Sequence, residues 1–295
     1  MDSNKITRDL ERATVLLKSG KAQDAETLAL RATQSDPSSA RAWFLAGVAR
    51  HQQLRPEGAL AAMEHALALE PELAEARQAR ATLLLGLKRP RAALAEIREL
   101  MRRAPGNARL KVDAAIVLEE MEENAAGLEL YEEALRLSPR DFRALLNRGA
   151  LLIKLERLEE ALSNNLSLVK SYIGSAAALY NLGDNFLCLH RFEEAQETFS
   201  RVLDIEPGHI PARMGRGLAL SMLRRFAEAS AEFVRARSDN PEEADAYFVR
   251  AARSIGHEDV RKLETDPRLI FIHGALLDLA SCIWHRREAL LEEVA

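Results

Sequence analysis

Hydrophobic and polar residues follow one another along the chain with the spacing of amphipathic α-helices. Residues 179–186, LYNLGDNF, are one example, with apolar side chains at the first, fourth and eighth positions and polar ones between them. Prolines then divide the chain at steps of 34 residues, except for one gap of 68 whose midpoint is Ile173. The pattern therefore predicts seven units without insertions: 6–39, 40–73, 74–107, 108–141, 142–175, 176–209 and 210–243.

Small residues recur at two places in each 34-residue unit. The side chains at position 8 are Ala13, Gly47, Ala81, Ala115, Gly149, Gly183 and Gly217. Those at position 20 are Ala25, Ala59, Ala93, Gly127, Ala161, Ala195 and Ala229. Small residues on both sides of a short polar turn allow two antiparallel helices to approach closely. Each unit is therefore predicted to be a helix hairpin, and the proline at position 32 is predicted to end its second helix.

This arrangement resembles the tetratricopeptide repeat, whose pattern is W-x2-L-G-x2-Y, then A-x3-F, then P. The sixth unit matches it with Leu182-Gly183, Phe186, Ala195, Phe199 and Pro207. The third unit departs from it at Arg80 and Ala81, and the fifth lacks the proline. The resemblance covers roughly residues 6–243. It implies an all-α fold, a right-handed superhelix (α-solenoid) of stacked hairpins with the first helices on its inner side.

The resemblance also implies which side chains line the inner groove, mainly those at positions 2, 5, 6, 9, 12 and 13 of each first helix. An asparagine there can donate to and accept from a peptide backbone. Neighbouring inner helices lie roughly 10 Å apart, and an extended chain covers about 3.3 Å per residue. One asparagine per unit would therefore meet about every third residue of a guest peptide. The candidate peptide-binding residues are Phe44, Asp113, Leu146, Asn147, Tyr180, Asn181, Asp184 and Met214.

A structural role is the alternative for the same residues. Asn147 and Asn181 can equally be solvated polar residues on a helix surface. Phe44, Tyr180 and Met214 can instead pack against a neighbouring unit.

Composition and charge narrow the possible partners. The formal net charge of −4 argues against nucleic acid, which requires a basic surface. The sequence begins without a secretory signal and contains no uncharged run of 18 residues, which predicts a cytoplasmic chain with no membrane partner. Cys188 and Cys282 are the only cysteines and lack metal-ligand spacing, so we expect no disulfide, metal or cofactor. The arginine-rich segment 74–107 precedes an acidic one, 108–141, and the two are expected to attract each other.

The last part of the chain, 244–295, departs from the repeat. It begins as an eighth unit, but position 24 of that unit falls on Pro267. The segment LLDLASCIWHRREALLEEVA resembles the helical segment that joins the repeats to the catalytic lobes in bacterial relatives of O-linked N-acetylglucosamine transferase (SPINDLY-like proteins). The asparagines in LNRG and YNLG resemble the inner asparagine ladder of that family. The alternative is a terminal helix that caps the apolar face of the last hairpin.

The sequence as a whole predicts a protein-binding module with no catalytic site of its own. One hypothesis is that it recognises an acceptor polypeptide for a bacterial protein glycosyltransferase. The other is a free-standing adaptor in a bacterial assembly. Enzyme activity within these residues has the least support, because no nucleophile has an evident base. Self-association stays open.

Overall fold

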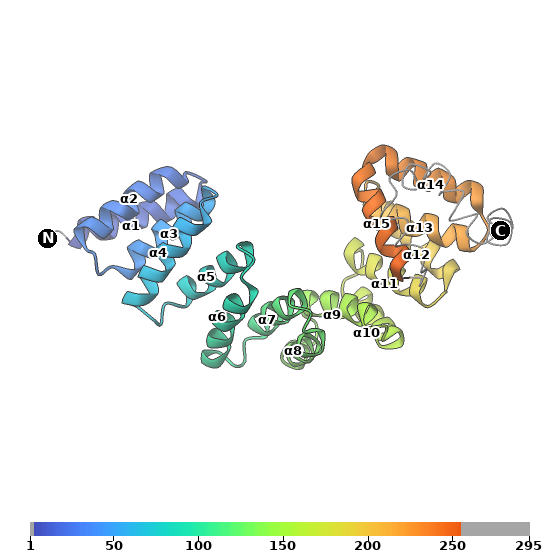
Figure 1. Cartoon of the computed structure of the whole chain (residues 1–295), viewed down its shortest axis with the longest axis horizontal. Helices are drawn as coiled ribbons and strands as arrows, with labels where there is room; N and C mark the ends of the chain where they lie inside the picture. The colour runs from blue at the N-terminus through green and yellow to red at the C-terminus, as the bar shows by residue number, and fades with distance from the viewer. Residues whose placement is uncertain (1–2, 255–295) are drawn as a thin grey trace, which may run out of the picture. The chain divides into compact units, whose positions relative to one another are not determined.

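The computed structural model describes residues 3–254, which form fifteen α-helices and no strand within that range. The helices are α1 Ser3–Lys18, α2 Ala22–Ser35, α3 Ala40–Gln52, α4 Pro56–Leu69, α5 Ala74–Gly86, α6 Pro90–Arg103, α7 Ala108–Glu120, α8 Asn124–Leu137, α9 Phe142–Lys154, α10 Leu158–Ser171, α11 Ala176–Cys188, α12 Phe192–Ile205, α13 Ile210–Met222, α14 Phe226–Asp239 and α15 Pro241–Ser254. Successive helices form hairpins, from α1 with α2 to α13 with α14 (Figure 1).

Local chemistry explains where the helices begin and end. The first helices of several hairpins follow a residue whose side chain accepts from a backbone N–H of the first turn, as Asp141 does from Ala144 at 2.8 Å. The second helices end just before a proline, as α4 does before Pro71. The fifth hairpin has no proline, and there Gly174 turns the chain with a φ of +82°.

The turn inside each hairpin has a repeated left-handed residue. Gly20 holds this conformation in the first hairpin, and non-glycine residues hold it in the next six. These residues, all at position 15 of their units, are Leu54, Lys88, Glu122, Glu156, His190 and Arg224, with φ between 56° and 61°. A left-handed conformation is unfavourable for residues with a Cβ atom, so each turn stores a small amount of backbone strain.

The small residues at position 8 allow the two helices of a hairpin to touch. A Cβ atom added to Gly183 would lie 2.7 Å from the ring of Phe199, and one added to Gly217 would lie 2.7 Å from the ring of Phe233. Both rings are almost completely buried. The close approach expected from the small residues is therefore present in these hairpins.

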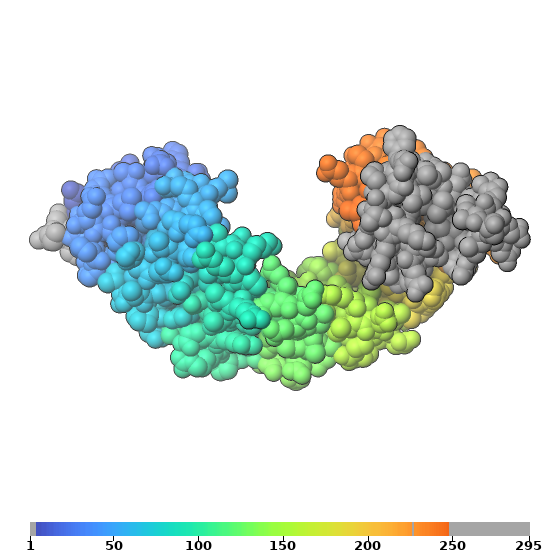
Figure 2. All heavy atoms as spheres, viewed as in Figure 1, coloured from blue at the N-terminus to red at the C-terminus, as the bar shows by residue number. Residues whose placement is uncertain are grey.

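The chain divides into two compact units, Met1–Pro139 and Arg140–Ala295. Within the first, α1 contacts α3, and α3 contacts α5. Within the second, α9 contacts α11, α11 contacts α13, and α13 contacts α15. The first helices named here thus lie side by side, and the surface that the first helices present is called the inner face below. Side chains fill the spaces between the ribbons of each unit (Figure 2).

The start of α15 breaks the spacing of the earlier hairpins. The other first helices of the second unit begin three residues after position 32, but α15 begins at Pro241 itself. Asn240 serves both helices: its N–H donates to the carbonyl of Ala236 in α14, and its Oδ1 accepts from the N–H of Glu243 in α15. No loop therefore separates α14 from α15. The predicted capping segment beyond residue 254 lies outside the described residues.

Neither a membrane-spanning helix nor a metal-binding cluster is present in the described part of the chain. None of its helices combines the length and the apolar character needed to cross a bilayer. Nor do its histidine, cysteine, aspartate and glutamate side chains form a group of three or more suited to hold a metal ion.

Candidate functional site

The inner face of the second unit brings together five of the predicted peptide-binding residues on two neighbouring helices. Leu146 and Asn147 lie on α9, and Tyr180, Asn181 and Asp184 lie on α11. All five side chains are half-buried. The surface therefore combines apolar side chains with amide and carboxylate groups along adjacent helices.

Asn181 joins the two helices directly. Its Nδ2 donates to the carbonyl oxygen of Leu146 at 2.9 Å. The backbone carbonyl oxygen of Asn181 accepts a hydrogen bond from Nδ2 of Asn165 on α10 at 3.3 Å. Asn181 is thus partly structural, and its remaining side-chain acceptor, Oδ1, is the atom that can meet a backbone N–H of a guest. Asn147, half-buried at the same position one repeat earlier, keeps the dual donor and acceptor character of an amide.

Tyr180 lies at the border between inner face and core. Its ring centroid is 5.1 Å from that of His209 and 6.0 Å from that of Phe199. The ring packs against the apolar clusters of both the sixth and the seventh hairpin. Packing on one side therefore fixes the orientation of the Tyr180 ring.

Asp184 accepts a hydrogen bond from the hydroxyl of Tyr247 on α15, with 3.2 Å between the oxygens. Cys188 follows one helical turn later on the same face. Burial, and secondarily the negative charge of Asp184, raises the pKa of the Cys188 thiol to about 11. The thiol is therefore protonated at neutral pH and is a poor nucleophile.

Met214 does not belong to the exposed part of this face. Its side chain is only 3 % exposed and packs in a cluster with Ile210, Leu218 and Phe233. The prediction of a contact residue at this position is corrected accordingly, because the apolar side chain is sealed in the core.

The remaining two predicted residues lie in the first unit. Phe44 on α3 is half-buried between two apolar clusters, and the guanidinium of Arg41 lies 5.0 Å from its ring centroid. Asp113 on α7 is also half-buried. Phe44 therefore has the packing role that was its alternative, with one side still accessible.

A set of buried amides next to the inner face escaped the sequence analysis. Asn165 and Asn185 are 0 % exposed, and Asn164 is 5 % exposed. Asn164 donates to the carbonyl of Leu145 at 2.7 Å and to Oδ1 of Asn165 at 3.2 Å. We call Asn164, Asn165, Asn181 and Asn185 the amide cluster.

The amide cluster connects three helices. Asn185 on α11 donates to the carbonyl of Leu158 on α10 at 3.1 Å, while its Oδ1 has no hydrogen-bond partner among the described residues. Arg148 on α9 donates to Oδ1 of Asn164 at 3.2 Å. The signal was in the sequence: position 24 holds Asn165 in the fifth unit, whereas the other six carry Ala29, Met63, Ile97, Tyr131, Phe199 and Phe233.

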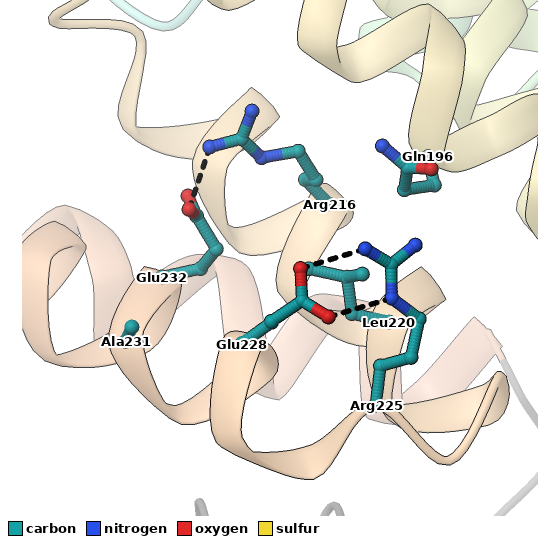
Figure 3. Close-up of a pocket in the computed structure, with 7 residues that line it drawn as sticks. All are labelled: Gln196, Arg216, Leu220, Arg225, Glu228, Ala231 and Glu232. Atoms are coloured by element: carbon teal, nitrogen blue, oxygen red, sulfur yellow. Dashed lines mark hydrogen bonds and ion pairs between the residues drawn. The ribbon is translucent and has the colours of Figure 1, made fainter.

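A pocket of about 250 Å³ is lined by residues of the seventh hairpin and by one residue of α12, and none of them belongs to the amide cluster (Figure 3). It is lined by Gln196, Arg216, Leu220, Arg225, Glu228, Ala231 and Glu232. Its charges are already paired: Arg216 contacts Glu232 at 2.6 Å, and Arg225 contacts Glu228 at 2.6 Å (Figure 3). The opposite charges within the pocket balance, which disfavours an ionic ligand.

The same ion-pair arrangement occurs in the third hairpin, which supports a structural role. There Glu96 contacts Arg77 at 2.8 Å and Arg80 at 3.2 Å. In the seventh hairpin Arg213 and Arg216 take the places of these arginines, and Glu232 takes the place of Glu96. In both hairpins, arginines at positions 4 and 7 clamp a glutamate at position 23. Lys88 of the arginine-rich segment forms an ion pair with Glu120 of the acidic segment at 3.3 Å, as expected from the opposite charges of the two segments.

Comparison with known proteins agrees with this architecture. Two sequence profiles, both described as tetratricopeptide repeat, match residues 10–74 and 112–176, and 176–209, which together exceed half of the chain. No curated protein sequence matches the chain.

Several solved structures share the fold. A tetratricopeptide repeat protein from Parabacteroides merdae is 15 % identical with a TM-score of 0.67, over 83 % of this chain and 98 % of the other. MamA from Desulfovibrio magneticus RS-1 is 20 % identical with a TM-score of 0.54, over 58 % and 97 %. YrrB, described as a TPR protein with an unusual peptide-binding site, is 24 % identical with a TM-score of 0.51, over 62 % and 95 %. The helix hairpins, the sequence profiles and the shared fold together show that this chain belongs to the tetratricopeptide-repeat family.

Proposed function

We propose that the chain is a protein-binding module that holds a polypeptide segment on the inner face of α9 and α11. The observation that carries this proposal is the row of half-buried side chains on the two helices: Leu146, Asn147, Tyr180, Asn181 and Asp184. Stacked repeats present extended surfaces of this kind to protein partners. The similarity to YrrB, whose description includes a peptide-binding site, supports the same class of function.

Each group on this surface has a defined task in the proposal. Asn147 donates to and accepts from the guest backbone, while Asn181 accepts through Oδ1 because its Nδ2 is held by Leu146. Tyr180 and Leu146 provide apolar contact area. Asp184 selects a hydroxyl or a basic side chain, and its hydrogen bond with the hydroxyl of Tyr247 is an internal example of that preference.

Two more specific roles remain predictions. The first is acceptor recognition for a bacterial protein glycosyltransferase. It is supported by the asparagines of LNRG and YNLG and by the C-terminal segment, which lies outside the described residues. The second is a free-standing adaptor in a bacterial assembly. A gene that continues past residue 295 into sugar-nucleotide lobes would favour the first, and a gene that ends there would favour the second.

Selection from a displayed library of random peptides tests the proposed surface. The selected peptides are labelled, and their dissociation constants are measured by fluorescence anisotropy for the full chain and its variants. Asn147→Ala is expected to weaken binding by about tenfold, the effect of roughly 1.4 kcal/mol of lost hydrogen bonding.

The matched control is Glu197→Ala on α12, which removes an exposed side chain away from the inner face. It is expected to leave the dissociation constant unchanged. Equal affinities for the wild type and Asn147→Ala would disprove the proposed surface.

A further inference from the structure

The hydrogen bond between Tyr247 and Asp184 joins helices that ordinary repeat stacking would keep apart. Tyr247 belongs to α15, the first helix after the seventh hairpin, while Asp184 belongs to the first helix of the sixth. Regular stacking would place one whole inner helix, α13, between them. Since packed helices are about 10 Å apart, the two axes would then be separated by about 20 Å, too far for one tyrosine side chain to bridge.

Two buried apolar residues of α13 occupy the inner face between Tyr247 and Asp184. Met214 and Leu218, at positions 5 and 9, are 3 % and 7 % exposed and share an apolar cluster with Tyr247. By contrast, Val48 and Ile116, the large apolar residues at position 9 of other hairpins, are only half-buried. The tyrosine itself is only 3 % exposed. The positions that would face a guest on α13 are therefore already covered.

The junction between α14 and α15 differs from the earlier junctions. α15 starts at Pro241, immediately after Asn240, without the loop that precedes the other first helices of the second unit. α15 contacts both α13 and α14, as α13 contacts α11 and α12 (Figure 1). Its tyrosine hydroxyl then reaches the carboxylate of α11.

From these contacts we infer that α15 is an intramolecular occupant of the inner face, bound over α13 and against Asp184, which a polypeptide partner must displace. This inference rests on the proposed function. The displaced contact has a defined chemistry: a helix contributing one aromatic ring to the Met214 and Leu218 cluster and one hydroxyl to Asp184. A partner that uses Asp184 therefore competes directly with Tyr247.

Chemical crosslinking in the full chain tests where α15 lies. The background carries Cys188→Ser and Cys282→Ser, and the test pair is Asp184→Cys with Tyr247→Cys. A short bismaleimide should join the test pair within one chain several times faster than a control pair of Asp184→Cys with Glu242→Cys, since Glu242 is exposed at the start of α15. Equal rates for the two pairs would overturn the placement.

Peptide binding tests whether α15 obstructs the surface. The peptides selected with the wild-type chain are titrated into Tyr247→Phe, which removes only the hydroxyl, and Tyr247→Ala, which also empties the aromatic site. Affinity should rise in the order wild type, Tyr247→Phe, Tyr247→Ala, with about a tenfold gain for the last. Helix content by circular dichroism verifies that both variants are folded.

The two measurements separate the inference from the proposed function. If no peptide binds to any variant, the proposed function fails, while crosslinking still decides the position of α15. If peptides bind equally to all three chains, displacement of α15 is disproved and the proposed function stands.

Discussion

Nδ2 of Asn181 lies 2.9 Å from the carbonyl oxygen of Leu146, 35 residues earlier in the chain. This contact ties α11 to α9 through a side chain on the surface that we propose for peptide binding. The same residue therefore contributes to repeat stacking and to recognition, whereas Asn147 has no comparable bond to a preceding helix among the hydrogen bonds of the described residues.

Asn181→Ala should lower the free energy of unfolding by about 1 kcal/mol, the net value of one intramolecular hydrogen bond. Asn147→Ala, at the equivalent position one repeat earlier, should change it much less. Urea denaturation followed by circular dichroism measures both. Equal losses for the two variants would show that the bond to Leu146 does not stabilise the stack.

Gly149→Ala should destabilise the fifth hairpin by about 1 to 3 kcal/mol, in the range of overpacked cores. Its new Cβ would lie 2.0 Å from Oδ1 of Asn165, which the amide cluster holds in place. Gly47→Ala is the matched control at position 8 of the second hairpin. There the nearest atom is the flexible tip of Met63 at 2.7 Å, so the loss should be smaller. Melting temperatures of the two variants compare the effects directly.

The acid sensitivity of the first unit should depend on Glu26. Burial alone would raise the pKa of Glu26. Hydrogen bonds from Arg50 and Gln53, together with the charges of Arg55 and Arg50, outweigh burial and hold this pKa below its usual value of 4.5. A carboxyl group with a lowered pKa stabilises the fold fully above its unfolded pKa, and that contribution disappears as pH falls through the folded value.

Glu26→Gln should therefore be less stable than the wild type at neutral pH, with a difference that shrinks as the pH falls below 4.5. Denaturant titrations at a series of pH values measure this difference. A difference that stays constant down to pH about 3 would show that Glu26 carries no such linkage.

Leu54→Gly should stabilise the chain by about 1 kcal/mol, because a left-handed conformation costs a residue with a Cβ atom about that much. Leu54 has a φ of 58° and is 88 % exposed, so little packing is lost. Gly20→Ala is the reverse control: Gly20 has a φ of 74° and no atom within 4 Å of a new Cβ. It should destabilise the chain through backbone strain alone, and opposite shifts of the melting temperature would support the explanation.

The hairpin fold could be predicted because its determinants repeat. Proline at position 32 and small residues at position 8 act locally, so their effect on each helix follows from the sequence. The all-α repeat class predicted in this way is confirmed by the helices and by the shared fold of the related structures. The left-handed residue at position 15 was not anticipated, since leucine, glutamate and arginine there give no compositional signal of a turn.

The candidate surface was harder to predict, because it depends on contacts between repeats. Position 5 holds Tyr180 in one hairpin and Met214 in the next, yet the first is half-buried and the second is sealed in the core. Sequence spacing assigns both to the same face, but their burial depends on packing against neighbouring helices, as it does for Val112 at the same position of the fourth hairpin. Likewise, the burial of Asn165 depends on its place at position 24 of the fifth hairpin, where it packs between helices.

The amide cluster also affects how the repeats separate under mechanical force. A repeat array behaves as a linear series of nearest-neighbour couplings, so rupture starts at its weakest joint. Where α10 meets α11, amide groups occupy space that aromatic rings fill in the sixth and seventh hairpins, and one buried acceptor of Asn185 lacks a partner within the described range. Pulling on the second unit from its two ends should accordingly load the side-chain hydrogen bonds of Asn165, Asn181 and Asn185 wherever the fifth and sixth hairpins begin to separate.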